Sequence, residues 1–147
     1  ALIKCRAATT TTALPAIADD SGLVVPALNG EPGVYSARYA SENAQDADNN
    51  SKLLAQMAQC DDRRAFFFCC VTFMRSAADP TPIIAFGRWH GEILRQPKGE
   101  MGFGYDPLFY VPEHNATAAE LPPNIKNQLS HRGIACRALL SHLQELG

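Results

Sequence analysis

The chain has 147 residues, of which 46% are hydrophobic and 19% are charged, and its formal net charge is −2. A domain of this length buries roughly 68–70% of its unfolded surface, which is enough for one core. The negative net charge argues against a protein that binds nucleic acid through a basic face, and no apolar stretch reaches the length of a membrane span.

The first part of the chain predicts helix, strand, turn, strand and helix. Residues 1–8 are good helix formers without a cap, so we expect a helix that the chain enters part-way. The apolar runs 16–18 and 23–25 flank a Ser-Gly pair, which predicts two strands joined by a turn. Residues 46–58 have an acidic start and apolar side chains at helical spacing, which is typical of an amphipathic helix.

Two long strands are predicted in the middle of the chain. Residues 66–74 form an almost continuous apolar run that favours a central strand covered on both faces. Residues 83–94 predict a second long strand, in which Gly87 and Gly91 indicate a bulge or a close backbone approach. A third, short extended piece is expected at residues 108–111.

Two more segments complete the expected fold. Residues 29–41 contain glycines, two tyrosines and Arg38, and an ordered loop of this kind is more often functional than connecting. After Gly133, leucines and small residues share one stripe, which predicts a helix packed on the sheet. Together these elements predict one α/β domain with functional groups on loops at strand ends.

Three short runs combine charged or hydroxyl side chains with glycines, which is typical of loop chemistry on a rigid scaffold. They are Ala18–Gly22 (ADDSG), Gly102–Pro107 (GFGYDP) and Ser130–Gly133 (SHRG). They supply paired carboxylates, an aromatic glycine turn and a cationic turn. Such parts are suited to hold a metal, a base and a polyphosphate.

Asp19 and Asp20 are adjacent at a strand end, so their side chains are expected on opposite faces. One is expected to bind a divalent cation or activate water, and the other to anchor the turn through backbone N–H groups. Ser21 adds a hydroxyl donor, and Gly22 allows a phosphate to approach the backbone. A purely structural turn that caps the strand remains the alternative.

The second run places the Phe103 ring between Gly102 and Gly104, as a base-stacking platform requires. Tyr105 and Asp106 follow before a stiffening proline. The alternative is a tight β-turn that leads into a strand.

The third run, with Lys126 before it, gathers three cationic or titratable side chains. Lys126, His131 and Arg132 form a candidate receptor for an anion or a carbonyl oxygen, and Arg132 suits forked contacts. The alternative is a helix capped by Ser130, with cations exposed to solvent beyond it.

The five cysteines lack the spacing of a zinc site, and their odd number argues against a disulfide framework. Cys69 and Cys70 lie inside an apolar run. Reduced thiols in the cytoplasm are therefore expected.

In this order, and with Pro32–Tyr39 (PGVYSARY) between the first two, these runs resemble the inosine triphosphate pyrophosphatase family, which removes deaminated purine nucleotides from the nucleotide pool. The resemblance implies an ITPase-like α/β fold, with a long curved mixed sheet flanked by helices and a substrate cleft between two lobes. It implies a homodimer and a Mg²⁺-dependent hydrolase that converts ITP, dITP or XTP and water to the monophosphate and pyrophosphate. From the net charge and the lack of a long apolar stretch, no nucleic-acid or membrane partner is expected.

The resemblance also assigns roles to individual residues. Asp20 matches the general base and metal ligand. Phe103 matches the ring that stacks on the purine, and His131 and Arg132 match contacts near its 6-keto edge. The complete set of expected substrate contacts is Lys4, Ser21, Phe103, Gly104, Tyr105, Asp106, Lys126, His131 and Arg132.

The family pattern also has features that residues 1–147 do not contain. These are an N-terminal strand, a phosphate-binding loop of the Thr/Ser-Gly-Asn-x-x-Lys kind and a first helix, so we expect a single domain over 1–147 without them. Pro122-Pro123-Asn124 predicts less helix than is usual before the lysine. Two alternatives stay open, namely an inactive nucleotide-binding remnant and a relative that acts on other modified nucleotides.

Overall fold

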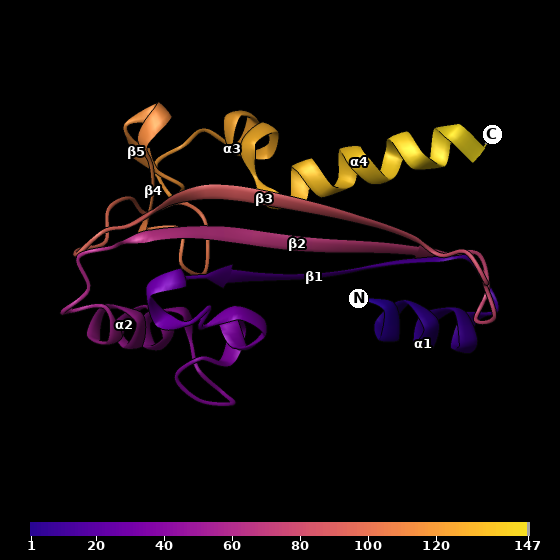
Figure 1. Cartoon of the computed structure of the whole chain (residues 1–147), viewed down its shortest axis with the longest axis horizontal. Coiled ribbons are helices and arrows are strands. Elements are labelled where there is room, and N and C mark those ends of the chain that lie inside the picture. Colours follow the sequence, from indigo (N-terminus) through magenta and orange to yellow (C-terminus); the bar gives the residue numbers. More distant parts are fainter. Residues whose placement is uncertain (147) are drawn as a thin grey trace. The chain divides into compact units, whose positions relative to one another are not determined.

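The computed structural model describes residues 1–146, and Figure 1 labels its elements. The α-helices are α1 (Leu2–Thr12), α2 (Asp46–Gln56), α3 (Pro123–Leu129) and α4 (His131–Leu146). The strands are β1 (Ala16–Val24), β2 (Arg64–Met74), β3 (Ile83–Ile93), β4 (Phe109–Val111) and β5 (Ala116–Thr117). The α/β class and the sheet flanked by helices are confirmed.

The five strands form an antiparallel sheet in chain order, β1-β2-β3-β4-β5. Glu92 of β3 lies opposite Tyr110 of β4, which in turn lies opposite Thr117 of β5. Within residues 1–146 each strand is the neighbour of the next one in the chain, and the pairs β3–β4 and β4–β5 are antiparallel.

The chain divides into two compact units. The first unit comprises residues 1–21, 68–88 and those from Gln128 onward, and the second comprises 22–67 and 89–127. Each unit has its own buried core.

In the first unit, α4 packs on one face of β2 and β3. The shared core consists of Cys69, Val71, Ala85, Ala135 and Leu139. The expected close approach at Gly87 is confirmed, because a Cβ there would lie 2.0 Å from the carbonyl oxygen of His131 and 2.7 Å from the nitrogen of Ala135. The absence of a side chain therefore sets how near α4 comes to the sheet.

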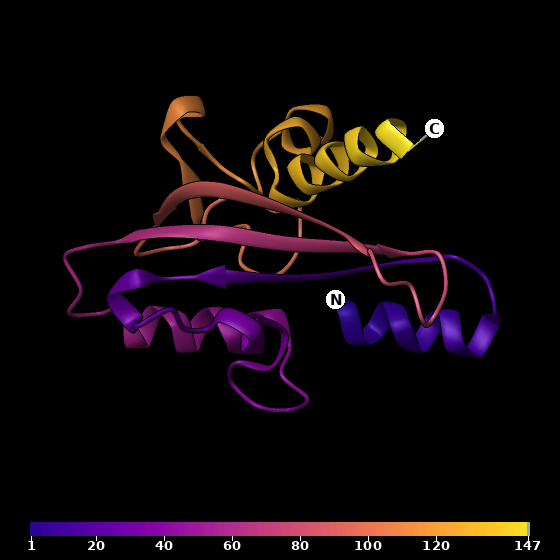
Figure 2. The same ribbon diagram turned by 45° about the vertical axis from the view of Figure 1, so that its right-hand side comes forward.

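The other face of the same strands is covered in part by α1, and Figures 1 and 2 show α1 and α4 on opposite sides of the sheet. Cys5 is fully buried, and its thiol donates to the carbonyl oxygen of Ala16 at 3.1 Å. The helix is capped by Ala13, whose φ of 58° is left-handed and whose N–H bonds to the carbonyl of Thr9.

In the second unit, three aromatic rings pack together. The Phe67 ring centroid lies 4.5 Å from that of Phe109 and 6.2 Å from that of Trp89. Leu53 of α2 and Met57 at its C-cap are fully buried, so the predicted amphipathic helix is confirmed. This core gives the loops of the second unit a fixed support.

Two expectations about local structure are wrong in the region of β1 and β2. No turn interrupts β1 at Ser21-Gly22; Gly22 is needed because a Cβ there would lie 2.3 Å from the carbonyl oxygen of Gly33. The apolar run in β2 is fully covered on one face only, since Phe67, Cys69 and Val71 are buried while the side chains between them are half-buried.

Two further corrections concern the C-terminal helices. The double proline does not prevent a helix, because α3 begins at Pro123, where a helix has no need of the missing N–H. On α4, Ala135 and Leu139 are buried as expected, whereas Leu140 and Leu146 are more than half exposed.

No helix within residues 1–146 has both the length and the apolar character needed to cross a bilayer. All five cysteines are free thiols.

Candidate active site

The two adjacent aspartates of β1 point to opposite faces of the strand, as their spacing predicts. Asp20 pairs with the ammonium of Lys4 on α1. On the other face, the Nε of Arg132 at the start of α4 lies 3.3 Å from the Asp19 carboxylate and donates to the Ser21 hydroxyl at 3.2 Å. Asp19 therefore anchors an arginine rather than the expected turn.

Asp20 offers an ionised and accessible carboxylate. Its side chain is 51% exposed. The ammonium of Lys4, followed by the amino group of Ala1, holds the pKa of the Asp20 carboxyl below its usual value, and only slight burial opposes this. The carboxylate is therefore charged at neutral pH.

Asp20 fits Mg²⁺ only as a single protein ligand. No three Asp, Glu, His or Cys side chains converge as a metal cage in the described part of the chain. Mg²⁺ commonly keeps several waters and takes one or two carboxylates together with phosphate oxygens of a substrate. One exposed carboxylate beside a cation that can move away is compatible with that coordination.

The cationic turn forms the start of α4. The Ser130 hydroxyl accepts the Gly133 N–H at 3.1 Å, so the expected helix cap is present. This cap fixes the first turn of α4, which carries His131 and Arg132. The cap and a binding role for Arg132 are compatible, because the guanidinium is held at Asp19 instead of lying free in solvent.

In the second unit, residues 102–107 form a loop that depends on its glycines. Gly102 and Gly104 have φ values of 84° and 61°, a region that side-chain-bearing residues rarely adopt. A Cβ on Gly102 would lie 2.4 Å from the Oδ2 of Asp106. The same Oδ2 accepts the Phe103 N–H at 3.0 Å, which closes the loop.

The loop presents an exposed ring beside a cation. The Phe103 side chain is 64% exposed. The Nζ of Lys126 lies 4.7 Å from the ring centroid and 2.5 Å from the Oδ2 of Asp106. A stacking surface and a directed ammonium therefore stand together, which suits a flat heterocycle with an electronegative edge.

Tyr105 and Asp106 lie beneath this surface. Both are buried, and the Tyr105 hydroxyl donates to the Ser36 carbonyl at 2.7 Å. Burial is the main reason why the pKa of Tyr105 lies well above its usual value. In the free protein these two side chains hold the loop.

The candidate site residues thus form two clusters, one in each unit. The Ham1 family model matches residues 1–142. The chain belongs to the Ham1 family.

Curated relatives of this Ham1 chain are similar over nearly its whole length. A dITP/XTP pyrophosphatase of Legionella pneumophila (strain Paris) is 54% identical over 147 residues, which cover 99% of this chain and 76% of the relative. Another dITP/XTP pyrophosphatase, from Aromatoleum aromaticum, is 57% identical over 143 residues, with 97% and 72% covered.

Solved structures of Ham1 proteins show the same fold. A HAM1 protein from Coxiella burnetii superposes with a TM-score of 0.95 at 52% identity, covering 99% of this chain and 75% of that one. The Ham1 protein of Staphylococcus aureus gives a TM-score of 0.94 at 44% identity, covering 100% and 76%.

This Ham1 chain also has site contacts on α2 that the sequence reasoning missed. Asp46 and Asn50 bond to the backbone of Gly104. On the same helix, Asn49 bonds to the backbone of Ala37 and Ala40. The only signal in the sequence was a cluster of short polar side chains in a helix, where such residues are not intrinsically favoured.

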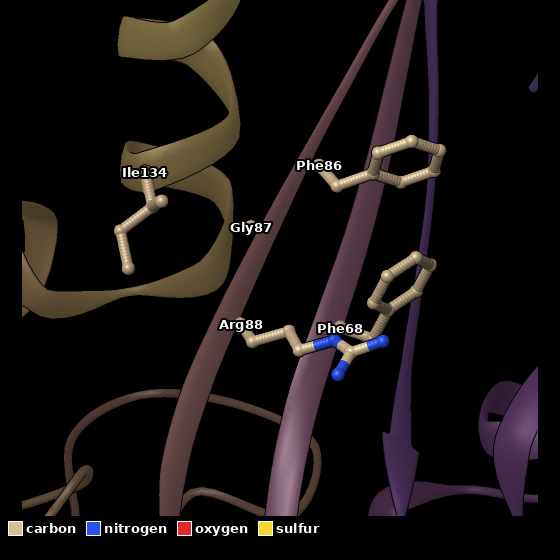
Figure 3. A pocket seen from close by; sticks show the side chains of 5 residues that line it. All are labelled: Phe68, Phe86, Gly87, Arg88 and Ile134. Carbon is tan, nitrogen blue, oxygen red and sulfur yellow. The ribbon is translucent and has the colours of Figure 1, made fainter.

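One hollow of about 440 Å³ lies in the first unit of the Ham1 chain, and Figure 3 shows its lining residues: Phe68, Phe86, Gly87, Arg88 and Ile134. The Phe68 and Phe86 rings stack with centroids 5.6 Å apart, and the Arg88 guanidinium carbon lies 5.7 Å from the Phe68 ring centroid. None of the residues predicted as site residues lines it.

Proposed function

We propose that this Ham1-family chain hydrolyses deaminated purine nucleoside triphosphates, namely dITP, XTP and ITP, to the monophosphate and pyrophosphate. The observation that carries the proposal is the 54% identity, over 99% of the chain, to a protein named dITP/XTP pyrophosphatase. The exposed Phe103 ring beside the Lys126 ammonium supports it, because a 6-keto purine has a flat face and an acceptor edge.

In this proposal Asp20 is the metal ligand and the base at the scissile bond. The Asp20 carboxylate would hold Mg²⁺ together with phosphate oxygens, and the bound metal supplies charge neutralisation and a more acidic water. Asp20 accepts a proton from the attacking water, whose oxygen bonds to the α-phosphorus as the bond from that phosphorus to the pyrophosphate oxygen breaks. Lys4 leaves Asp20 and turns to the phosphates, for which an ammonium is a suitable counter-charge.

The purine is selected by donors that match its keto group. The family resemblance assigns stacking on the base to Phe103 and the contacts near the 6-keto edge to His131 and Arg132, with Lys126 as a further cationic substrate contact. Adenine presents a 6-amino donor instead, and a site whose donors are left unpaired rejects such a base strongly. Ser21 and the Gly104 backbone complete the substrate contacts, with Tyr105 and Asp106 supporting the loop.

We also propose that the enzyme is a homodimer and that it works in a reducing compartment, the cytoplasm. The family resemblance supports the homodimer. The five free thiols support the compartment, because disulfides persist in oxidising surroundings.

The test is release of pyrophosphate from XTP, dITP, ITP, GTP, ATP and dUTP by the purified chain, with Mg²⁺ or with EDTA. We expect hydrolysis of the first three in Mg²⁺ only, and loss of activity in a folded Asp20→Asn variant. Preference for dUTP would favour a pyrophosphatase of other nucleotides. Binding of XTP without hydrolysis would instead indicate an inactive nucleotide-binding protein.

A further inference from the structure

The peptide backbone of Gly104 is held on both sides by one helix. Its N–H donates to the Oδ2 of Asp46 at 2.8 Å, and its carbonyl accepts from the Nδ2 of Asn50 at 3.0 Å. Asp46 and Asn50 are four residues apart on α2, which places them one above the other on the same helix face. Both groups of this backbone position are therefore satisfied by side chains more than 50 residues away.

Within the loop, Phe103 is held by the bond from its N–H to Asp106 and by the Lys126 ammonium beside its ring, and the bonds to Gly104 add a support from outside the loop. The ring is largely exposed, and the next residue has a left-handed backbone that glycine adopts without fixing it. On a glycine loop without support, the ring would sample many conformations before binding and would lose them when a base binds. This loss of conformational entropy would reduce the affinity for the base.

The helix that provides the support is itself fixed. Leu53 is buried in the core of the second unit. On the polar side, Asn49 accepts the Ala40 N–H at 2.9 Å, and the Lys52 ammonium donates to the Tyr39 carbonyl at 2.9 Å. A helix held on two sides places its side chains more precisely than a loop does.

We propose that Asp46 and Asn50 are positioning residues for purine binding, which hold the Gly104 backbone and thereby preorganise the Phe103 ring. The inference rests on the proposed function, and it adds two residues of α2 that touch neither base nor phosphate. Their loss weakens the binding of every purine, because stacking does not distinguish one purine from another.

The kinetic test compares Asp46→Ala and Asn50→Asp with a matched control on the same helix turn. Asn50→Asp keeps the shape but sets a carboxylate against the Gly104 carbonyl. Asp48→Ala is the control, because Asp48 accepts the Gln45 N–H at 2.9 Å in the capping box of α2. We expect KM for ITP and ATP to rise about 3- to 10-fold in the two test variants, the effect of one lost hydrogen bond, with kcat little changed.

The control separates positioning from stability. Asp48→Ala should lower the unfolding midpoint without raising KM, and Asp46→Asn, which keeps an acceptor oxygen, should restore most of the affinity. Equal KM increases in Asp46→Ala and Asp48→Ala would overturn the proposal, as would an unchanged KM in both test variants.

A second readout does not require hydrolysis. Amide hydrogen exchange of Gly104, measured by NMR, should accelerate about 10-fold or more in Asp46→Ala, while amides of β2 keep their protection. If the wild-type chain hydrolysed no nucleotide, the proposed function would fail, and the exchange of the Gly104 amide would still decide whether α2 holds the loop. Unchanged exchange in Asp46→Ala would show that it does not.

Discussion

Asp106 and Lys126 form an ion pair that is almost removed from solvent, with 2.5 Å between Oδ2 and Nζ and side-chain exposures of 6% and 19%. The pair joins the Phe103 loop to α3. In Lys126→Met the buried carboxylate keeps its bond from Phe103 N–H but loses its counter-charge. We expect a loss of about 2–4 kcal/mol in the free energy of unfolding, measured by urea denaturation. Wild-type stability in this variant would show that the pair contributes nothing.

The catalytic assignment of Asp20 predicts a contrast with its neighbour. Asp20→Asn should lower kcat by orders of magnitude, because it removes the base and metal ligand while keeping the shape. Asp19→Asn makes the same change on the other face of β1 and should have a much smaller effect, limited to the orientation of Arg132. Steady-state kinetics with XTP and circular dichroism of both variants provide the comparison, and an active, folded Asp20→Asn would refute the assignment.

Phe103 and Arg132 are expected to affect binding and selectivity differently. Phe103→Ala should weaken the binding of all purine nucleotides by about 1–3 kcal/mol, the usual contribution of a stacked base. Arg132→Ala should instead reduce the preference for ITP over ATP. Competition assays with ITP and ATP give both quantities, and a constant ITP/ATP ratio in Arg132→Ala would move the recognition of the keto group to another residue.

The contact between Gly87 and α4 predicts that even a methyl group is harmful there. In Gly87→Ala the new carbon would meet the His131 carbonyl oxygen at 2.0 Å, so α4 must move. We expect a loss of about 1–3 kcal/mol from this overpacking, together with lower kcat because the first turn of α4 shifts. Urea unfolding and XTP kinetics test both effects, and a variant that is as stable as the wild type would contradict so close an approach of α4 to β3.

Asp79 predicts an acid-sensitive turn between β2 and β3. The Arg75 side chain, with the N–H groups of Arg75 and Thr81, holds the pKa of the Asp79 carboxyl far below its usual value. A lowered pKa in the folded state gives stability that is complete above the unfolded pKa of about 3.9 and is lost as the pH falls through the folded value. At pH 7 the unfolding midpoint of the wild type should therefore be higher than that of Asp79→Asn. The difference between the two midpoints should narrow below about pH 4. A gap that is constant from pH 3 to 7 would contradict this.

The regular spacing of apolar side chains was sufficient to predict the elements that bury one face along their length. The spacing of Leu53 and Met57 predicted α2, and the period of two in a strand placed Asp19 and Asp20 on opposite faces. The turn predicted from the Ser21-Gly22 pair is absent, because Gly22 is needed for the close approach of the Gly33 carbonyl. No local sequence pattern reveals that contact.

Part of the candidate site is visible within one short run of sequence, which sets the Phe103 ring between two glycines; in the structure this ring is exposed and both glycines have a left-handed backbone. The support of that loop by Asp46 and Asn50 is not visible in the sequence, because it joins segments 54 and 58 residues apart through side chains that commonly serve as helix caps. Such contacts follow from tertiary structure alone.

Side chains alternate between the two faces of β1, so the face on which Asp20 lies depends on whether the number of residues before it in the strand is odd or even. One residue inserted between Pro15 and Asp19 would slide the strand by a single step and exchange the two carboxylates between Lys4 and Arg132. Two inserted residues would restore the original faces. Single and paired insertions near residue 16 therefore place the two carboxylates on different faces, and the activities of the two kinds of variant are expected to differ.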